Sequence, residues 1–251
     1  MKKTHKINIL LAVSLCVILA AFFSKAIPQD AHYHAFADAR TIFSIVNFCN
    51  VMSNIPFVIF GGLGLVSLQK QAKSKEKDQF HFNYLFFFIG IFLTGFGSAY
   101  YHYNPMIDTL VWDRLPMVIT FMAFFSIIIG DYIDVDWGKK LLFPLQIIGL
   151  SSVIYWYITE QYGVGDLRFY AIIQFLPLIL ILLILAFFNQ KNTFTPYVFA
   201  IIGVYAIAKL FETYDAPIFH FTNEIISGHS LKHFAAAIAP ILFLKGKLKM
   251  L

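Results

Sequence analysis

Long apolar segments alternate along this chain with short polar ones. A helix needs about 20 predominantly apolar residues to cross a bilayer, and lipid offers no hydrogen-bond partner for open strand edges. Eight segments approach this length and character, and they occupy residues 7–23, 43–68, 84–103, 109–132, 140–158, 167–188, 195–213 and 228–244. The pattern therefore predicts an all-α fold, a polytopic membrane helical bundle.

The first apolar segment differs from the others in its flanks. Lys2, Lys3 and Lys6 precede it, and Ser24-Lys25-Ala26 after it resembles a small-residue cleavage site. Residues 1–26 are therefore a signal peptide or an extra N-terminal transmembrane helix, and the length of the apolar run favours the retained helix. Residues 27–251 then form a seven-helix transmembrane domain.

The lysines indicate how the helices are oriented, because cytoplasmic loops of membrane proteins are enriched in Lys and Arg. With eight crossings, every lysine cluster falls on one side of the membrane: Lys2, Lys3 and Lys6; Lys70, Lys73, Lys75 and Lys77; Lys139 and Lys140; Lys191; Lys245, Lys247 and Lys249. We expect this side to be cytoplasmic. The outer loops are then residues 27–42, 104–108, 159–166 and 214–227.

Composition agrees with a protein that is dissolved in lipid. Hydrophobic residues make up 59% of the chain and charged residues 13%, and the mean hydropathy is +0.71, which excludes an ordinary soluble globular domain. The lysines that contribute to the net charge of +5 lie in short clusters between apolar segments, where they set membrane orientation. We therefore expect no nucleic-acid partner, and no feature indicates an obligate protein partner.

Ionisable groups in membrane helices are costly, so each one needs an explanation. Ser98 and His102 are four residues apart and share a helix face, Asp113 opens the next segment, and His229 and His233 open the last one at the same spacing. The topology places all five at similar depth near the outer side. Three histidines and one open position are typical of catalytic zinc.

Simpler explanations exist for each of these residues alone. A single interfacial histidine is usually a hydrogen-bonded residue without a metal, and an isolated H-x-x-x-H occurs by chance, so the metal hypothesis depends on their co-location. Lys209 and Glu212 are three residues apart, which predicts a structural ion pair ahead of a substrate contact. We expect the remaining histidines to be solvated: His5, His32, His34, His81 and His220.

Four short motifs in this order resemble the signatures of the alkaline ceramidases. These enzymes belong to a superfamily of seven-helix membrane hydrolases that includes the adiponectin and progestin receptor-like proteins and the Per1-like proteins. The resemblance spans about residues 38–240, and it is carried by Asn50-Val51-Met52-Ser53-Asn54, Gly97-Ser98-Ala99-Tyr100-Tyr101-His102, Trp112-Asp113-Arg114-Leu115-Pro116-Met117 and Gly228-His229-Ser230-Leu231-Lys232-His233.

The resemblance implies a zinc-dependent amidohydrolase that cleaves ceramide or a related N-acyl lipid to a fatty acid and a sphingoid base. His102, His229 and His233 would hold the zinc ion. Asp113 would act as the acid–base residue, and Ser98 would donate to the developing oxyanion. Tyr170 could also hydrogen-bond the substrate, although tyrosine is common at membrane interfaces.

The chain departs from this family at a second metal site. Animal alkaline ceramidases carry an acidic, calcium-binding stretch, which includes a Glu three residues before the Asn that opens the N-x-x-S-N signature. Asn47 stands at that position here, and Asp38 is a further candidate oxygen ligand. Calcium wants six to eight oxygen ligands, so this carboxylate-poor loop argues against calcium dependence.

Two other functions compete with the amidohydrolase hypothesis. A seven-helix lipid-binding receptor or sensor could use the same metal pocket structurally, but no sizeable soluble output domain accompanies the bundle. A lipid esterase could use the same zinc site. In each case the partner is a lipid in the bilayer, and we expect a bacterial cytoplasmic (inner) membrane with the site near the periplasmic face.

Overall fold

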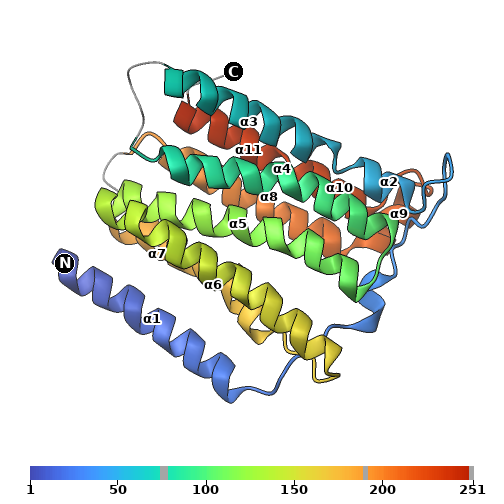
Figure 1. The fold of residues 1–251 in the computed structure, drawn as a ribbon, viewed down its shortest axis with the longest axis horizontal. Helices are drawn as coiled ribbons and strands as arrows, with labels where there is room; N and C mark the ends of the chain where they lie inside the picture. Colours follow the sequence, from blue (N-terminus) through green and yellow to red (C-terminus); the bar gives the residue numbers. More distant parts are fainter. Residues whose placement is uncertain (74–78, 189–191, 249–251) are drawn as a thin grey trace. The chain divides into compact units, whose positions relative to one another are not determined.

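The computed structural model describes residues 1–73, 79–188 and 192–248, and its regular elements in this part of the chain are helices (Figure 1). The all-α prediction is therefore confirmed. Among the lysines used to predict orientation, Lys75, Lys77, Lys191 and Lys249 lie outside the described residues, as does the side chain of Lys73. The contacts divide the chain into two compact units, to both of which α4 (His81–Tyr103) and α5 (Ile107–Tyr132) contribute residues.

The first unit comprises residues 1–30, 82–87 and 118–192. It contains α1 (Lys3–Phe23), the second half of α5, α6 (Val135–Gln161) and α7 (Arg168–Phe188). Both α1 and α6 pack against α7. Asp134 begins α6 as its N-cap, because its side chain accepts hydrogen bonds from the backbone N–H groups of Asp136 and Trp137.

Polar contacts fasten α1 to α7 near both ends. Lys6 Nζ donates to the carbonyl of Phe187, and Arg168 Nη1 donates to the carbonyls of Ala21 (3.3 Å) in the last turn of α1 and of Ser24 (2.5 Å), the C-cap of α1. Arg168 also pairs with Asp166 at 2.8 Å, and its hydrogen bonds lower the pKa of that carboxyl to about 2. The boundary between residues 1–26 and 27–251 stays a prediction.

The second unit comprises residues 31–81, 88–117 and 193–251, of which 74–78 and 249–251 are not described. Besides parts of α4 and α5, it contains η1 (Ala31–His34), α2 (Phe48–Met52), α3 (Ile55–Lys73), α8 (Thr195–Thr213), α9 (Asp215–Phe221), α10 (Gly228–Ala236), α11 (Ile238–Phe243) and the π-helical turn η2 (Leu244–Leu248). Helices α10 and α11 pack against α8. This unit holds the candidate site.

Seven stretches of the described chain are long and apolar enough to cross a membrane. They are α1, residues 48–72, α4, α5, α6, α7 and α8. The protein is therefore an integral, multi-pass membrane protein, as the apolar pattern predicted.

Two of the eight predicted segments differ from the structure. The segment at 43–68 becomes helical only from Phe48, because Phe43, Ser44 and Asn47 have positive φ and form a turned loop. The segment at 228–244 is split at Ala237 into α10 and α11, each too short to count as a span. Pro240 lies just beyond this break, and proline has no N–H to donate to the carbonyl four residues earlier.

Candidate metal centre

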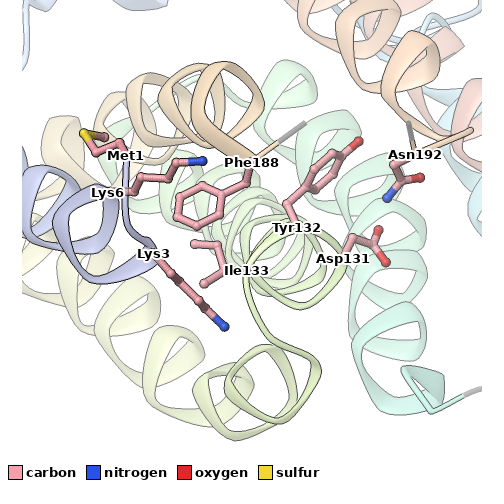
Figure 2. Close-up of a pocket in the computed structure, with 8 residues that line it drawn as sticks. All are labelled: Met1, Lys3, Lys6, Asp131, Tyr132, Ile133, Phe188 and Asn192. Atoms are coloured by element: carbon pink, nitrogen blue, oxygen red, sulfur yellow. The ribbon is translucent and has the colours of Figure 1, made fainter. Parts of the chain in front are cut away.

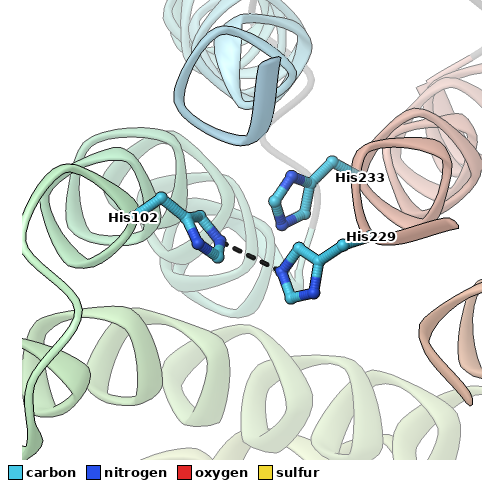
Figure 3. A group of neighbouring side chains, drawn as sticks. All are labelled: His102, His229 and His233. Carbon is cyan, nitrogen blue, oxygen red and sulfur yellow. Dashed lines mark hydrogen bonds between the residues drawn. The ribbon is translucent and has the colours of Figure 1, made fainter. Parts of the chain in front are cut away.

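Three buried histidines converge in the second unit (Figure 3). His102 lies in the last turn of α4, and His229 and His233 lie one turn apart on α10. One nitrogen from each ring lies within 4.8 Å of the others, and the Nε2 atoms of His102 and His229 are 3.3 Å apart. Among the described residues, this is the cluster of His, Cys, Asp or Glu side chains whose spacing could hold a metal ion.

The spacing of the rings fits a tetrahedral metal. Zinc–nitrogen bonds of about 2.0–2.1 Å place two tetrahedral nitrogen ligands roughly 3.3–3.4 Å apart. The His102–His229 pair has this separation already, at 3.3 Å. Neutral imidazole nitrogens suit zinc and several other transition metals, so the donor set fits a metal ion without fixing its identity.

The close approach of α10 to α8 and α9 places His229. At Gly228, a Cβ atom would lie 2.2 Å from the carbonyl oxygen of Phe211, so a larger residue would push α10 outward. Asp215 Oδ1 then accepts a hydrogen bond from the His229 backbone N–H at 2.7 Å, and its Oδ2 accepts one from the Ala37 N–H at 3.0 Å. One carboxylate therefore holds both the start of α10 and the loop before α2.

Residues of the N-x-x-S-N motif position the ring of His233. The Ser53 hydroxyl donates its single hydrogen to the Asn50 carbonyl at 3.0 Å, so it accepts from Nδ1 of His233 at 2.7 Å. His233 then carries its proton on Nδ1 and presents Nε2 to the cluster. The Asn50 side chain also accepts a hydrogen bond from Ser230 at 2.8 Å, which joins α2 to α10.

Replacing Ser53 by alanine is expected to weaken metal binding about 10–100-fold, because the ring of His233 loses the acceptor that fixes its tautomer and orientation. Competition with a chromophoric chelator measures this affinity. Ser67→Ala is the matched control, since it removes a serine hydroxyl from the same unit, on α3, that donates to the Leu63 carbonyl one turn earlier and does not contact His233. Equal metal affinity in the two variants would show that Ser53 does not support His233.

Ser98 and Asp113 lie together one turn away from His102. At Gly97, a Cβ atom would lie 2.0 Å from the Trp112 carbonyl oxygen, so glycine lets α4 approach α5 closely here. The Ser98 hydroxyl then donates to the Asp113 carboxylate, and both side chains are buried. Because Ser98 and His102 share a face of α4, this pair lies about one helical turn, roughly 5.4 Å along the helix axis, from the level of His102.

A network of charges joins α8 to α10 beside this pair. The predicted ion pair between Lys209 and Glu212 is confirmed at 2.5 Å, and Lys232 of α10 donates to the other Glu212 oxygen at 2.6 Å. The positive charge of Lys232 also interacts with the negative charge of Asp113. Helical spacing does not predict a partner for Lys232, because its contact with Glu212 joins residues 20 positions apart on two helices.

The loop before α2 covers the histidines. The ring of Phe36 packs edge-on against His102 and against His229, with centroids 4.7 Å away in both cases. Asn47, in the left-handed region with φ of 50°, donates its amide hydrogen to the His102 carbonyl at 2.9 Å. The loop therefore supports the end of α4 and also covers the histidine cluster.

The two candidate calcium ligands have other partners. Both carboxylate oxygens of Asp38 accept hydrogen bonds from Arg40, at 2.7 and 2.6 Å. Burial alone would raise the pKa of Asp38, but these hydrogen bonds outweigh burial and hold that pKa below its usual value. With Asn47 turned towards His102, the pair does not resemble the oxygen shell that calcium requires.

His34 and Tyr170 are both more buried than an interfacial or loop position would be. His34 is not a solvated loop residue, because it is half-buried and its Nδ1 lies 3.0 Å from the Tyr101 hydroxyl. Burial, followed by the positive charge of Arg114, lowers the pKa of His34. Tyr170 is buried on α7 in the first unit, and its contact with substrate stays a prediction.

Helices that can span a membrane and a buried three-histidine cluster define a class of protein, the polytopic membrane proteins with a candidate metal site. The family model "Ceramidase" matches residues 40–224, and the chain belongs to the Ceramidase family. The match includes Ser98, His102 and Asp113 and ends before His229. A search of curated proteins found no match. Membership in this family supports the conclusion that the protein is a membrane enzyme that hydrolyses ceramide.

Proposed function

We propose that this protein is a zinc-dependent amidohydrolase that cleaves the amide bond of ceramide or a related N-acyl lipid. The observation that carries the proposal is the convergence of His102, His229 and His233 in a buried cluster with the nitrogen spacing of a tetrahedral metal. Family membership supplies the substrate class. The products are a fatty acid and a sphingoid base.

When bound to the three histidines, zinc would supply Lewis-acid polarisation of the scissile carbonyl and activation of water. Asp113 takes up a proton as water attacks the amide carbon and returns it to the nitrogen of the leaving amine. The Ser98 hydroxyl, which donates to Asp113 in the free protein, turns to donate to the carbonyl oxygen as negative charge develops there. Tyr170 is proposed as a further hydrogen-bond donor to the substrate.

The proposed substrate comes from the bilayer itself. A buried site at the ends of membrane-spanning helices suits a lipid whose amide lies near the interface and whose acyl chain remains among apolar side chains. We place the site near the periplasmic face of a bacterial inner membrane, on the side opposite the lysine clusters. Asp38 and Asn47 contribute no calcium site to this proposal.

The test is a substrate panel combined with metal analysis. Purified protein is incubated with ceramide, other N-acyl lipids and glycerolipid esters, the products are identified by mass spectrometry, and the zinc content is measured. We expect a fatty acid and a sphingoid base from ceramide, and zinc near one ion per chain. Cleavage of esters but not of amides would indicate a lipid esterase. Protein that contains zinc but cleaves none of the lipids would indicate a receptor or sensor. Folded protein that cleaves ceramide without zinc would contradict the metal assignment.

A further inference from the structure

A cavity of about 530 Å³ lies in the first unit, separate from the histidine cluster of the second unit (Figure 2). Its volume is within the range of roughly 300–1,000 Å³ that is usual for sites that bind small ligands. The cavity is lined by residues of α1, the ends of α5 and α7, and nearby positions: Met1, Lys3, Lys6, Asp131, Tyr132, Ile133, Phe188 and Asn192.

Opposite charges occupy opposite sides of this cavity. Figure 2 shows Lys3 and Lys6 on the side of α1 and Asp131 on the other side, with Tyr132, Ile133 and Phe188 between them. Both kinds of charge therefore line one cavity, and apolar side chains lie between them. A ligand that fits must carry a negative and a positive group joined by a short linker.

Both lysines retain the capacity to bind an anion. Lys3 Nζ lies 3.7 Å from Asp134, and the two side chains are 56% and 40% exposed, so this ion pair is weak. Lys6 Nζ donates to the Phe187 carbonyl and lies 5.0 Å from the centre of the Phe188 ring. An ammonium group has three N–H donors, so Lys6 can also bind a phosphate oxygen.

The cavity lies at the membrane boundary. It includes the first residue of the span Lys3–Phe23 and the last residues of the spans Ile107–Tyr132 and Arg168–Phe188. The ends of membrane spans lie at the level of the lipid headgroups. Basic pockets between helices on the cytoplasmic side of a membrane bind phosphate-bearing headgroups.

We infer that this cavity binds the headgroup of a zwitterionic phospholipid of the phosphoethanolamine type. Lys3 and Lys6 bind the phosphate, and Asp131 accepts hydrogen bonds from the primary ammonium. Ile133 and Phe188 contact the glycerol and the first part of the acyl chains. The lipid thereby joins α1 to the ends of α5 and α7, at a site that takes no part in the proposed hydrolysis.

Native mass spectrometry of the full chain tests this inference. The protein is offered equal amounts of phosphatidylethanolamine, phosphatidylglycerol and phosphatidylcholine, and retained lipid is counted. We expect preferential retention of phosphatidylethanolamine. Phosphatidylglycerol has no ammonium group, and the quaternary ammonium of phosphatidylcholine has no N–H donors. The double variant Lys3→Gln, Lys6→Gln should retain at most about one tenth of the lipid that the unmodified protein retains. Asp131→Asn should abolish the preference over phosphatidylglycerol.

Two further variants separate binding from general effects of charge. Lys139→Gln combined with Lys140→Gln removes the same charge from two exposed positions in the same unit and should retain lipid like the unmodified protein. Ile133→Trp fills the cavity without changing its charge and should lose the lipid.

Three outcomes would overturn the inference. They are equal lipid retention by the cavity and control variants, the absence of any preference among the three lipids, and an intact mass that begins at residue 27. Because lipid retention is measured without turnover, none of these outcomes depends on the proposed hydrolase activity.

Discussion

His229→Ala is expected to abolish both zinc binding and ceramide hydrolysis. His229 supplies the nitrogen that lies 3.3 Å from that of His102, and two remaining histidines cannot complete the set of three ligands typical of catalytic zinc. Loss of an outer partner already costs about 10–100-fold in metal affinity, so loss of a ligand should cost more. Turnover should fall at least about 1,000-fold, since the metal stabilises the transition state by several kcal/mol.

The measurements are zinc content after gel filtration and the rate of ceramide hydrolysis, made on the same preparation. His220→Ala is the control, because His220 is exposed on α9 in the same unit. Asp215 accepts its hydrogen bond from the backbone of His229, so the variant keeps this contact and should remain folded. Full zinc content in a folded His229→Ala protein would contradict the assignment of the cluster as the metal centre.

Asp113→Asn is expected to leave zinc in place while turnover falls by about 10²–10⁴-fold, the usual contribution of general acid–base catalysis. Asparagine has the same shape and still accepts a hydrogen bond from Ser98, but it cannot take up the proton at this position. The loss should therefore appear in kcat, with little change in KM.

Asp108→Asn is the matched control for this variant, because Asp108 lies five residues earlier on α5 and is exposed. Steady-state kinetics and zinc content are measured for both proteins. If Asp113→Asn loses its zinc, Asp113 supports the metal rather than the proton transfer. Unchanged kcat in a zinc-loaded variant would refute the acid–base role.

The helical fold and the meeting of the histidines could be predicted because they depend on regular spacing. His229 and His233 share a face of any helix, and lysine placement put them near the same membrane side as His102. The N-x-x-S-N and Gly-His motifs marked Asn50, Ser53 and Gly228 as part of a signature, but a pattern of letters does not reveal hydrogen-bond partners.

The remaining features arise from tertiary contacts that have no periodic signal. Asp215 binds a backbone N–H of α10 only because Gly228 lets that helix approach. Arg40 reaches Asp38 within a loop whose conformation depends on positive φ at Phe43, Ser44 and Asn47. His34 was predicted to be solvated because the sequence does not show that Tyr101 lies beside it.

The carboxylate of Asp215 accepts hydrogen bonds from His229 and from Ala37, next to the ring of Phe36 that covers the histidines. The loop before α2 and the start of α10 are therefore held by the same carboxylate. Whatever strengthens one attachment preorganises the other, and the coupling must be reciprocal. A substrate that stabilises the loop in this position should accordingly tighten the binding of zinc, and zinc should tighten the binding of that substrate by the same factor.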